Sequence, residues 1–193
     1  MDSETIKQLR QITGAGVLSC QEALKESNND LDKAIEFLRK RGEKFANDKG
    51  SRTTNEGVVE SYIHSNHKIG VLLELVCETD FVARNEEFQK LAHDIALHIA
   101  AANPQWKERE EVPSEIVEKE RQIYKETLKN EKKPEEIIEK IAENKLEKFY
   151  STSCLLEQSF VKDDKLTIKA LVQAMTAKLG ENIQVKRFVR FSL

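Results

Sequence analysis

The chain has 193 residues, and its 31 basic and 34 acidic side chains leave a formal net charge of -3. Such a balance does not favour long-range attraction to a nucleic-acid backbone, so we expect no direct nucleic-acid partner. No apolar run approaches the about 20 residues that a membrane helix needs, and residues 1–12 lack the apolar block of a signal peptide. We therefore expect a cytoplasmic protein with no membrane contact.

Residues that could carry catalytic or metal chemistry are few and scattered. Cys20, Cys77 and Cys154 are far apart and form no CxxC pair, so we expect reduced thiols rather than a zinc site or disulfides. His93 and His98 do not share a helix face, and the chain has no motif for binding phosphate, dinucleotide or catalytic zinc. Cys77 is in phase with a buried strand, which disfavours a nucleophile. We expect no cofactor, no metal and no enzymatic activity.

Apolar spacing predicts three short helices at the start of the chain. The first ends at Gly14, and the second begins at Ser19, which forms a capping-box pattern with Glu22. The third begins at Asp30 and ends before Gly42. The apolar positions at helical spacing are Ile6, Leu9, Ile12, Cys20, Ala23, Leu24, Leu31, Ala34, Ile35 and Leu38. Three such helices form a bundle too small to be very stable alone.

A polar stretch at residues 43–57 separates these helices from a β-rich region and is typical of a linker. Residues 58–64 and 69–78 are rich in strand-forming residues, and the short polar segment between them predicts a hairpin. One face of the second strand is apolar: Ile69, Val71, Leu73, Leu75 and Cys77. Residues 183–191 alternate apolar and polar side chains and predict a third antiparallel strand.

Two helical regions follow the hairpin. Asn85 can cap a long helix that stops before Pro104. The charged segment 114–149 predicts an antiparallel helical hairpin with its turn at residues 129–133 and Pro134 in the first turn of the second helix. Most of its charged side chains are expected on the solvated face.

A last helix is predicted over residues 168–179 and ends at Gly180. Strands and helices together predict an α+β fold. We expect a three-helix domain of residues 1–42, a linker of residues 43–57 and an α+β core of residues 58–193 that includes the helical hairpin.

The segment "CETDFVARN" places an aromatic side chain, Phe81, where a buried strand ends and a helix is about to begin. An aromatic at such a junction usually belongs to the core, but it can also be offered to a partner. Asp80 has two compatible roles, as the cap of the following turn or as a partner contact.

The segment "TDFVARNEEF" resembles the elongation factor Ts family, the guanine-nucleotide exchange factors of elongation factor Tu. The likeness extends to "LRQITGAGVLSCQEALKESNNDLDKAIEFLR", "EGVVESYIHSNHKIGVLLELVCETDFVARN", "CLLEQSFVKDD" and "GENIQVKRFVR". It implies an N-terminal module of ubiquitin-associated type followed by an α+β core. It also implies a short form with a single core, for which a homodimer is a reasonable hypothesis.

The resemblance implies a role for one segment in displacing GDP. Thr79, Asp80, Phe81 and Val82 match the family segment that disturbs the magnesium site of elongation factor Tu. By this likeness Phe81 is the wedge that enters between side chains of the nucleotide domain. Both GDP-bound and nucleotide-free elongation factor Tu are expected as partners.

A second partner contact is implied for the N-terminal helices. Arg10, Val17 and Leu18 match positions expected to contact the nucleotide domain of elongation factor Tu. The residue-based alternative for Val17 and Leu18 is a hydrophobic staple at the start of the second helix. Gln21 and Glu22 depart from the basic pair that the family commonly carries after the cysteine, so we expect Val17 and Leu18 to carry more of the docking by that helix.

Two other classes of function are compatible with parts of the chain. A structural interaction protein would use the 114–149 hairpin as a coiled-coil contact. An RNA-binding protein would use the last strand, where basic and aromatic residues alternate: Lys186, Arg187, Phe188, Arg190 and Phe191. A sheet with one solvated face explains that strand more simply.

Overall fold

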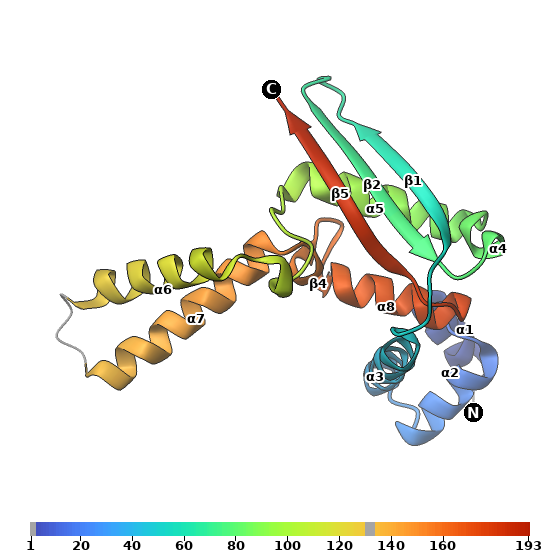
Figure 1. The fold of residues 1–193 in the computed structure, drawn as a ribbon. Helices are drawn as coiled ribbons and strands as arrows, with labels where there is room; N and C mark the ends of the chain where they lie inside the picture. Colours follow the sequence, from blue (N-terminus) through green and yellow to red (C-terminus); the bar gives the residue numbers. More distant parts are fainter. Residues whose placement is uncertain (1–2, 130–133) are drawn as a thin grey trace. The chain divides into compact units, whose positions relative to one another are not determined.

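The three N-terminal helices are α1 (Ser3–Thr13), α2 (Val17–Glu26) and α3 (Leu31–Lys49); in Figure 1, α1 and α2 are blue and α3 is blue-green. The computed structural model describes residues 3–129 and 134–193. The helices enclose a small apolar core of buried side chains: Leu9, Cys20, Ala23, Leu24 and Ala34. The helical spacing therefore predicts these buried positions correctly, because residues three and four apart share one side of a helix. Ile12, which the same spacing grouped with them, is exposed.

The start of α2 differs from the sequence prediction. The helix begins at Val17 with Gly16 at its N-cap, so Ser19 lies inside the helix and the predicted capping box is wrong. The carbonyl of Gly16 accepts the Cys20 N–H at 3.0 Å, so the helical hydrogen bonds start three residues before the predicted cap at Ser19. Asp30 caps α3 as predicted, because its side chain accepts the N–H of Lys33.

Helix α3 continues to Lys49, so the end expected at Gly42 is wrong and residues 43–49 are helical. This extension contacts α8 (Ile168–Leu179), because the Gln173 amide donates to the Asn47 side-chain oxygen at 3.3 Å. Just before the extension, a Cβ at Gly42 would lie 3.4 Å from the Ala177 side chain. The Lys49 ammonium also donates to the Gly180 carbonyl. Tertiary contacts therefore support a polar helix that its own apolar spacing did not predict. The division into domain, linker and core stays a prediction.

The three strands of the sheet are β1 (Glu56–Ile63), β2 (Ile69–Cys77) and β5 (Gln184–Ser192), in the order β1-β2-β5. The predicted three-stranded antiparallel sheet is thus confirmed. Helix α5 (Glu86–Ala102) lies across one face of the sheet (Figure 1). Asn85 caps this helix as predicted, since its side-chain oxygen accepts the Glu87 N–H at 2.8 Å.

Helices α6 (Ser114–Lys129) and α7 (Glu135–Ser153) form the predicted pair. Leu128, Ala142 and Leu146 are buried. The turn was predicted at residues 129–133, of which 130–133 lie outside the described residues. Pro134 is the N-cap of α7 rather than a first-turn residue.

Several short elements were not predicted. They are α4 (Asp80–Ala83), the 3₁₀ turns Arg109–Glu111 and Leu155–Glu157, and the paired strands β3 (Ser159–Phe160) and β4 (Asp163–Thr167). Each is too short to show a periodic apolar pattern, which is the signal that sequence analysis uses.

Contacts divide the chain into two compact units. The first comprises the described parts of Met1–Glu60, Glu74–Ala92 and Ala170–Lys186, and the remaining segments form the second. All the residues expected to contact a partner belong to the first unit. Within residues 3–129 and 134–193, no helix is long and apolar enough to cross a membrane.

Candidate functional site

The Thr79–Val82 segment forms a single helical turn directly after strand β2. Thr79 is the N-cap of α4, and its hydroxyl oxygen accepts the Val82 N–H at 3.5 Å. The cap predicted for Asp80 is therefore supplied by its neighbour. Asp80 is instead the first residue of the turn, and its carboxylate lies 3.2 Å from the guanidinium of Arg84. Val82 is half-buried.

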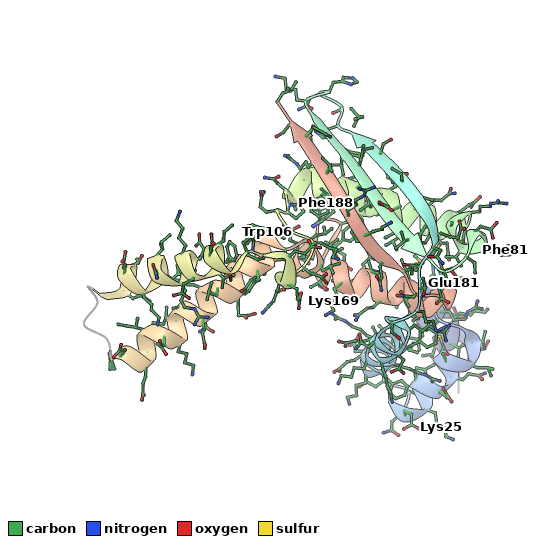
Figure 2. The ribbon with its side chains drawn as sticks, viewed as in Figure 1. Lys25, Phe81, Trp106, Lys169, Glu181 and Phe188 are labelled. Carbon is green, nitrogen blue, oxygen red and sulfur yellow. The ribbon has the colours of Figure 1, made fainter. Side chains whose placement is uncertain are left out.

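Phe81 occupies the second position of this turn, and its ring faces solvent. The residue is 83% exposed, and Figure 2 shows it projecting outward from α4. This exposure rules out the core reading of Phe81. A single exposed apolar side chain is common on protein surfaces. A Phe side chain as exposed as this one, however, contributes little to the packing of the turn that carries it. The arrangement leaves the ring available to a partner.

Glu181 fixes the segment from the other end of the chain, and sequence analysis missed it. Its carboxylate accepts the Glu78 N–H at 3.1 Å and the Thr79 N–H at 3.0 Å, and the Thr79 hydroxyl donates to it at 2.6 Å. The only sequence signal was an acidic residue directly after the predicted helix end at Gly180. Nothing local indicated its partners, which lie more than 100 residues earlier.

The N-terminal candidate residues are exposed on the helices that carry them. Arg10 lies in the last turn of α1, while Val17 and Leu18 form the start of α2. Leu18 is 78% exposed, so the hydrophobic staple considered for it is wrong. Ile12 is also exposed, although its helical spacing had grouped it with the buried positions of α1. These side chains offer apolar surface with one basic group.

Comparison with known proteins gives one consistent result. Residues 4–193 match the family described as elongation factor TS. The chain is 54% identical over 193 residues to elongation factor Ts of Fervidobacterium nodosum, covering 100% of this chain and 98% of that protein. It is 57% identical over 190 residues to elongation factor Ts of Petrotoga mobilis, covering 98% and 96%. The chain belongs to the elongation factor Ts family. The resemblance seen in the sequence is confirmed.

Membership of the elongation factor Ts family assigns the general activity. The protein is a nucleotide exchange factor for elongation factor Tu and acts in translation elongation, not as an enzyme. Elongation factor Tu is accordingly its partner. The match spans nearly the full length of this chain and of both relatives.

The thiols have environments that suit packing rather than reaction. All three cysteines are free and buried. Burial raises the pKa of Cys77 to about 11, and nearby Glu181 adds to that effect. A thiol in this state is a poor nucleophile, because the reactive form is the thiolate. Among residues 3–129 and 134–193, no group of three or more His, Cys, Asp or Glu side chains is arranged to hold a metal ion.

The departure at Gln21 and Glu22 has a structural counterpart. Glu22 forms an ion pair with Arg41 of α3, so its charge is balanced within the three N-terminal helices. Both side chains of this pair are largely exposed, which limits its contribution to stability to about 0–1 kcal/mol. The first turn of α2 has no acidic residue and exposes the apolar side chains of Val17 and Leu18.

Proposed function

We propose that this protein releases GDP from elongation factor Tu by inserting Phe81 into the nucleotide domain of its partner. Thr79, Asp80 and Val82 complete the segment that disturbs the magnesium and phosphate site. The observation that carries the proposal is the exposure of Phe81, which is 83%, on a turn whose start is hydrogen-bonded to Glu181. The family match supports it, because the same segment carries the resemblance.

Linkage explains how binding alone can expel a nucleotide. If the exchange factor binds nucleotide-free elongation factor Tu more tightly than the GDP-bound form, it must weaken GDP binding by the same factor. Fully burying a Phe side chain is worth about 1.5–3 kcal/mol, and each tenfold change in affinity needs about 1.4 kcal/mol. Burial of Phe81 only in the nucleotide-free complex thus accounts for about a ten- to hundredfold weakening of GDP. Other contacts must supply the remainder.

A second contact keeps the partner in place during displacement. We assign this role to Arg10, Val17 and Leu18, which are exposed on α1 and α2. A few well-packed residues near the centre of an interface contribute most of its binding free energy, and arginine is enriched among them. Contacts that form equally with both states of the partner increase affinity without changing the exchange equilibrium. Docking and displacement are therefore separable by mutation.

The test is release of fluorescent GDP from purified elongation factor Tu with this protein in catalytic amounts. Wild type should accelerate release, and Phe81→Ala should lose most of the acceleration with unchanged thermal stability. Val161→Ala is the matched control, because Val161 is an exposed apolar residue in the second unit, on the turn between β3 and β4. Absence of acceleration by folded wild type would refute exchange. Equal acceleration by wild type and Phe81→Ala would refute the proposed role of Phe81 in GDP release.

The sheet supports the homodimer hypothesis. Ile63 and Leu72 lie on its outer face, since a Cβ at Gly70 would meet Ile63 and alternate residues share a side. Val189 and Phe191 are also exposed, on strand β5. Arg190, between them, donates to a carbonyl of α5, so its neighbours point away from that helix. An exposed apolar surface of this kind is typical of an interface.

We propose that a second copy of the chain covers this sheet face, because a two-fold pair buries the same apolar patch on both copies. Light scattering should give the dimer mass for wild type and the monomer mass for Phe191→Lys. Ile137→Lys, an exposed apolar position on α7, is the control and should keep the dimer mass. A monomeric wild type at micromolar concentration would refute the dimer.

A further inference from the structure

We infer that Glu181 is a positioning residue for nucleotide exchange, because it fixes the backbone from which Phe81 projects. This inference rests on the proposed function of Phe81. Glu181 lies in the turn between α8 and β5. Its carboxylate instead receives three hydrogen bonds from the residues that precede Phe81.

The need for such a residue follows from the exposure of Phe81. A buried aromatic side chain is oriented by its packing, but a ring that is 83% exposed is oriented mainly by its own backbone. The α4 turn has only four residues, and a helix this short is not stable by itself. Contacts outside the turn must therefore fix its direction. Glu181 supplies such contacts at the N-cap of the turn, where its carboxylate accepts hydrogen bonds from the N–H and hydroxyl groups of Thr79.

A second carboxylate makes the attachment reciprocal. Glu78 accepts the Asn182 N–H at 2.7 Å, while Glu181 accepts the Glu78 N–H at 3.1 Å. Hydrogen bonding to Asn182 lowers the pKa of Glu78, and Arg52 adds to the effect with its guanidinium 3.5 Å from the carboxylate. The end of β2 and the start of β5 are thus joined in both directions by charge-assisted hydrogen bonds.

The same turn is tied to the end of α3. The amide of Asn182 donates to the Arg52 carbonyl at 2.7 Å and to the Gly50 carbonyl at 3.3 Å. Asn182 is buried, so these bonds are shielded from competing water. Helix α3 packs with α1 and α2, which carry the proposed docking residues. The turn at Glu181 and Asn182 therefore connects the α4 turn, which carries Phe81, with the N-terminal helices, which carry the proposed docking residues.

A fixed position of Phe81 relative to the N-terminal helices matters for exchange. When a partner binds to these helices, the Phe81 side chain is already placed to contact it. Ordering a loose segment on binding would take free energy from the displacement step. Loss of the Glu181 contacts should consequently reduce the maximal rate of GDP release more than it weakens docking. A fold defect would act differently, since a smaller folded fraction raises the half-saturating concentration and leaves the maximal rate unchanged.

The experiment titrates full-length exchange factor against elongation factor Tu loaded with fluorescent GDP and fits both quantities. Glu181→Ala should lower the maximal rate about tenfold and change the half-saturating concentration less than about twofold, where tenfold corresponds to about 1.4 kcal/mol. Glu181→Gln should stay close to wild type, because its amide oxygen can accept both N–H groups and its amide nitrogen can donate to the Thr79 hydroxyl. Glu147→Ala is the control, as that carboxylate binds Arg109 in the second unit.

A double-mutant cycle gives the decisive comparison. If Glu181 acts through Phe81, Glu181→Ala should cost nothing further in a Phe81→Ala background. An unchanged maximal rate in Glu181→Ala, an equal loss in Glu181→Gln, or additive losses in the double variant would each overturn the inference alone. If wild type fails to accelerate GDP release, the proposed function falls and this inference falls with it.

Discussion

Replacing His98 with Phe should destabilise the protein, because His98 is a fully buried member of a polar network in the second unit. Its Nε2 lies 2.9 Å from the side-chain oxygen of Gln158, and its Nδ1 accepts the Val161 N–H at 3.3 Å. The Gln158 amide in turn donates to the Thr152 carbonyl at 2.6 Å. This pattern requires a neutral imidazole with its proton on Nε2. Phe has a similar shape but can form neither bond.

The magnitude follows from which groups lose their partner. Gln158 is 4% exposed, so its side-chain oxygen would stay buried without a donor, at a cost of about 1–3 kcal/mol. The Val161 N–H lies nearer the surface and can regain water at a smaller cost. We expect a loss of about 1–3 kcal/mol out of a total unfolding free energy of about 5–15 kcal/mol.

The same residue makes stability depend on pH. Burial lowers the pKa of His98 below its ordinary value, and the hydrogen bond to Gln158 only partly opposes this. In the unfolded chain the imidazole binds a proton near its ordinary pKa of 6.5, so the unfolded state takes up protons first as the pH falls. The contribution of neutral His98 is thus fully present above that value. It is lost as the pH falls through the lower pKa of the folded protein.

Urea unfolding of wild type and His98→Phe at about pH 7.5 and about pH 5.5, either side of the ordinary histidine pKa, tests both statements. Wild type should lose more free energy of unfolding between the two pH values than His98→Phe does. His93→Phe is the control, because His93 is an exposed histidine on the same helix. Equal pH dependence in wild type and His98→Phe would refute the reasoning.

Three further predictions concern other positions. Gly57→Ala should lower the free energy of unfolding in urea by about 1–3 kcal/mol, since its Cβ would lie 2.2 Å from the Leu75 carbonyl oxygen. Gly16→Ala is the control and should lower the free energy of unfolding by less, because a Cβ at Gly16 has no neighbouring atom within 4 Å. Leu18→Ala should raise the half-saturating concentration for GDP release about tenfold without lowering the thermal unfolding temperature, because Leu18 is exposed in the free protein. Cys77 and the other two cysteines should react slowly with a thiol reagent at about pH 8 in the folded protein and readily in urea, as all three are buried.

Local patterns in the sequence were sufficient where hydrogen bonding and burial are local. Helix α8 has the predicted bounds, and the caps at Asp30 and Asn85 form as expected. A helix and its cap involve residues at most four apart, so their signals survive in one sequence. The same reasoning failed for residues 43–49, where contacts with α8 replace the missing apolar repeat.

The candidate site shows the same division. Sequence motifs alone indicated the family of the chain and identified Phe81 as a candidate contact. Matching a motif requires only the residue types and their order, which the sequence contains. Whether that ring is core or exposed was decided by tertiary structure, which leaves Phe81 exposed on the α4 turn. Glu181 became visible only in three dimensions. Its partners lie more than 100 residues away in the chain, and packing alone brings such residues within hydrogen-bonding distance.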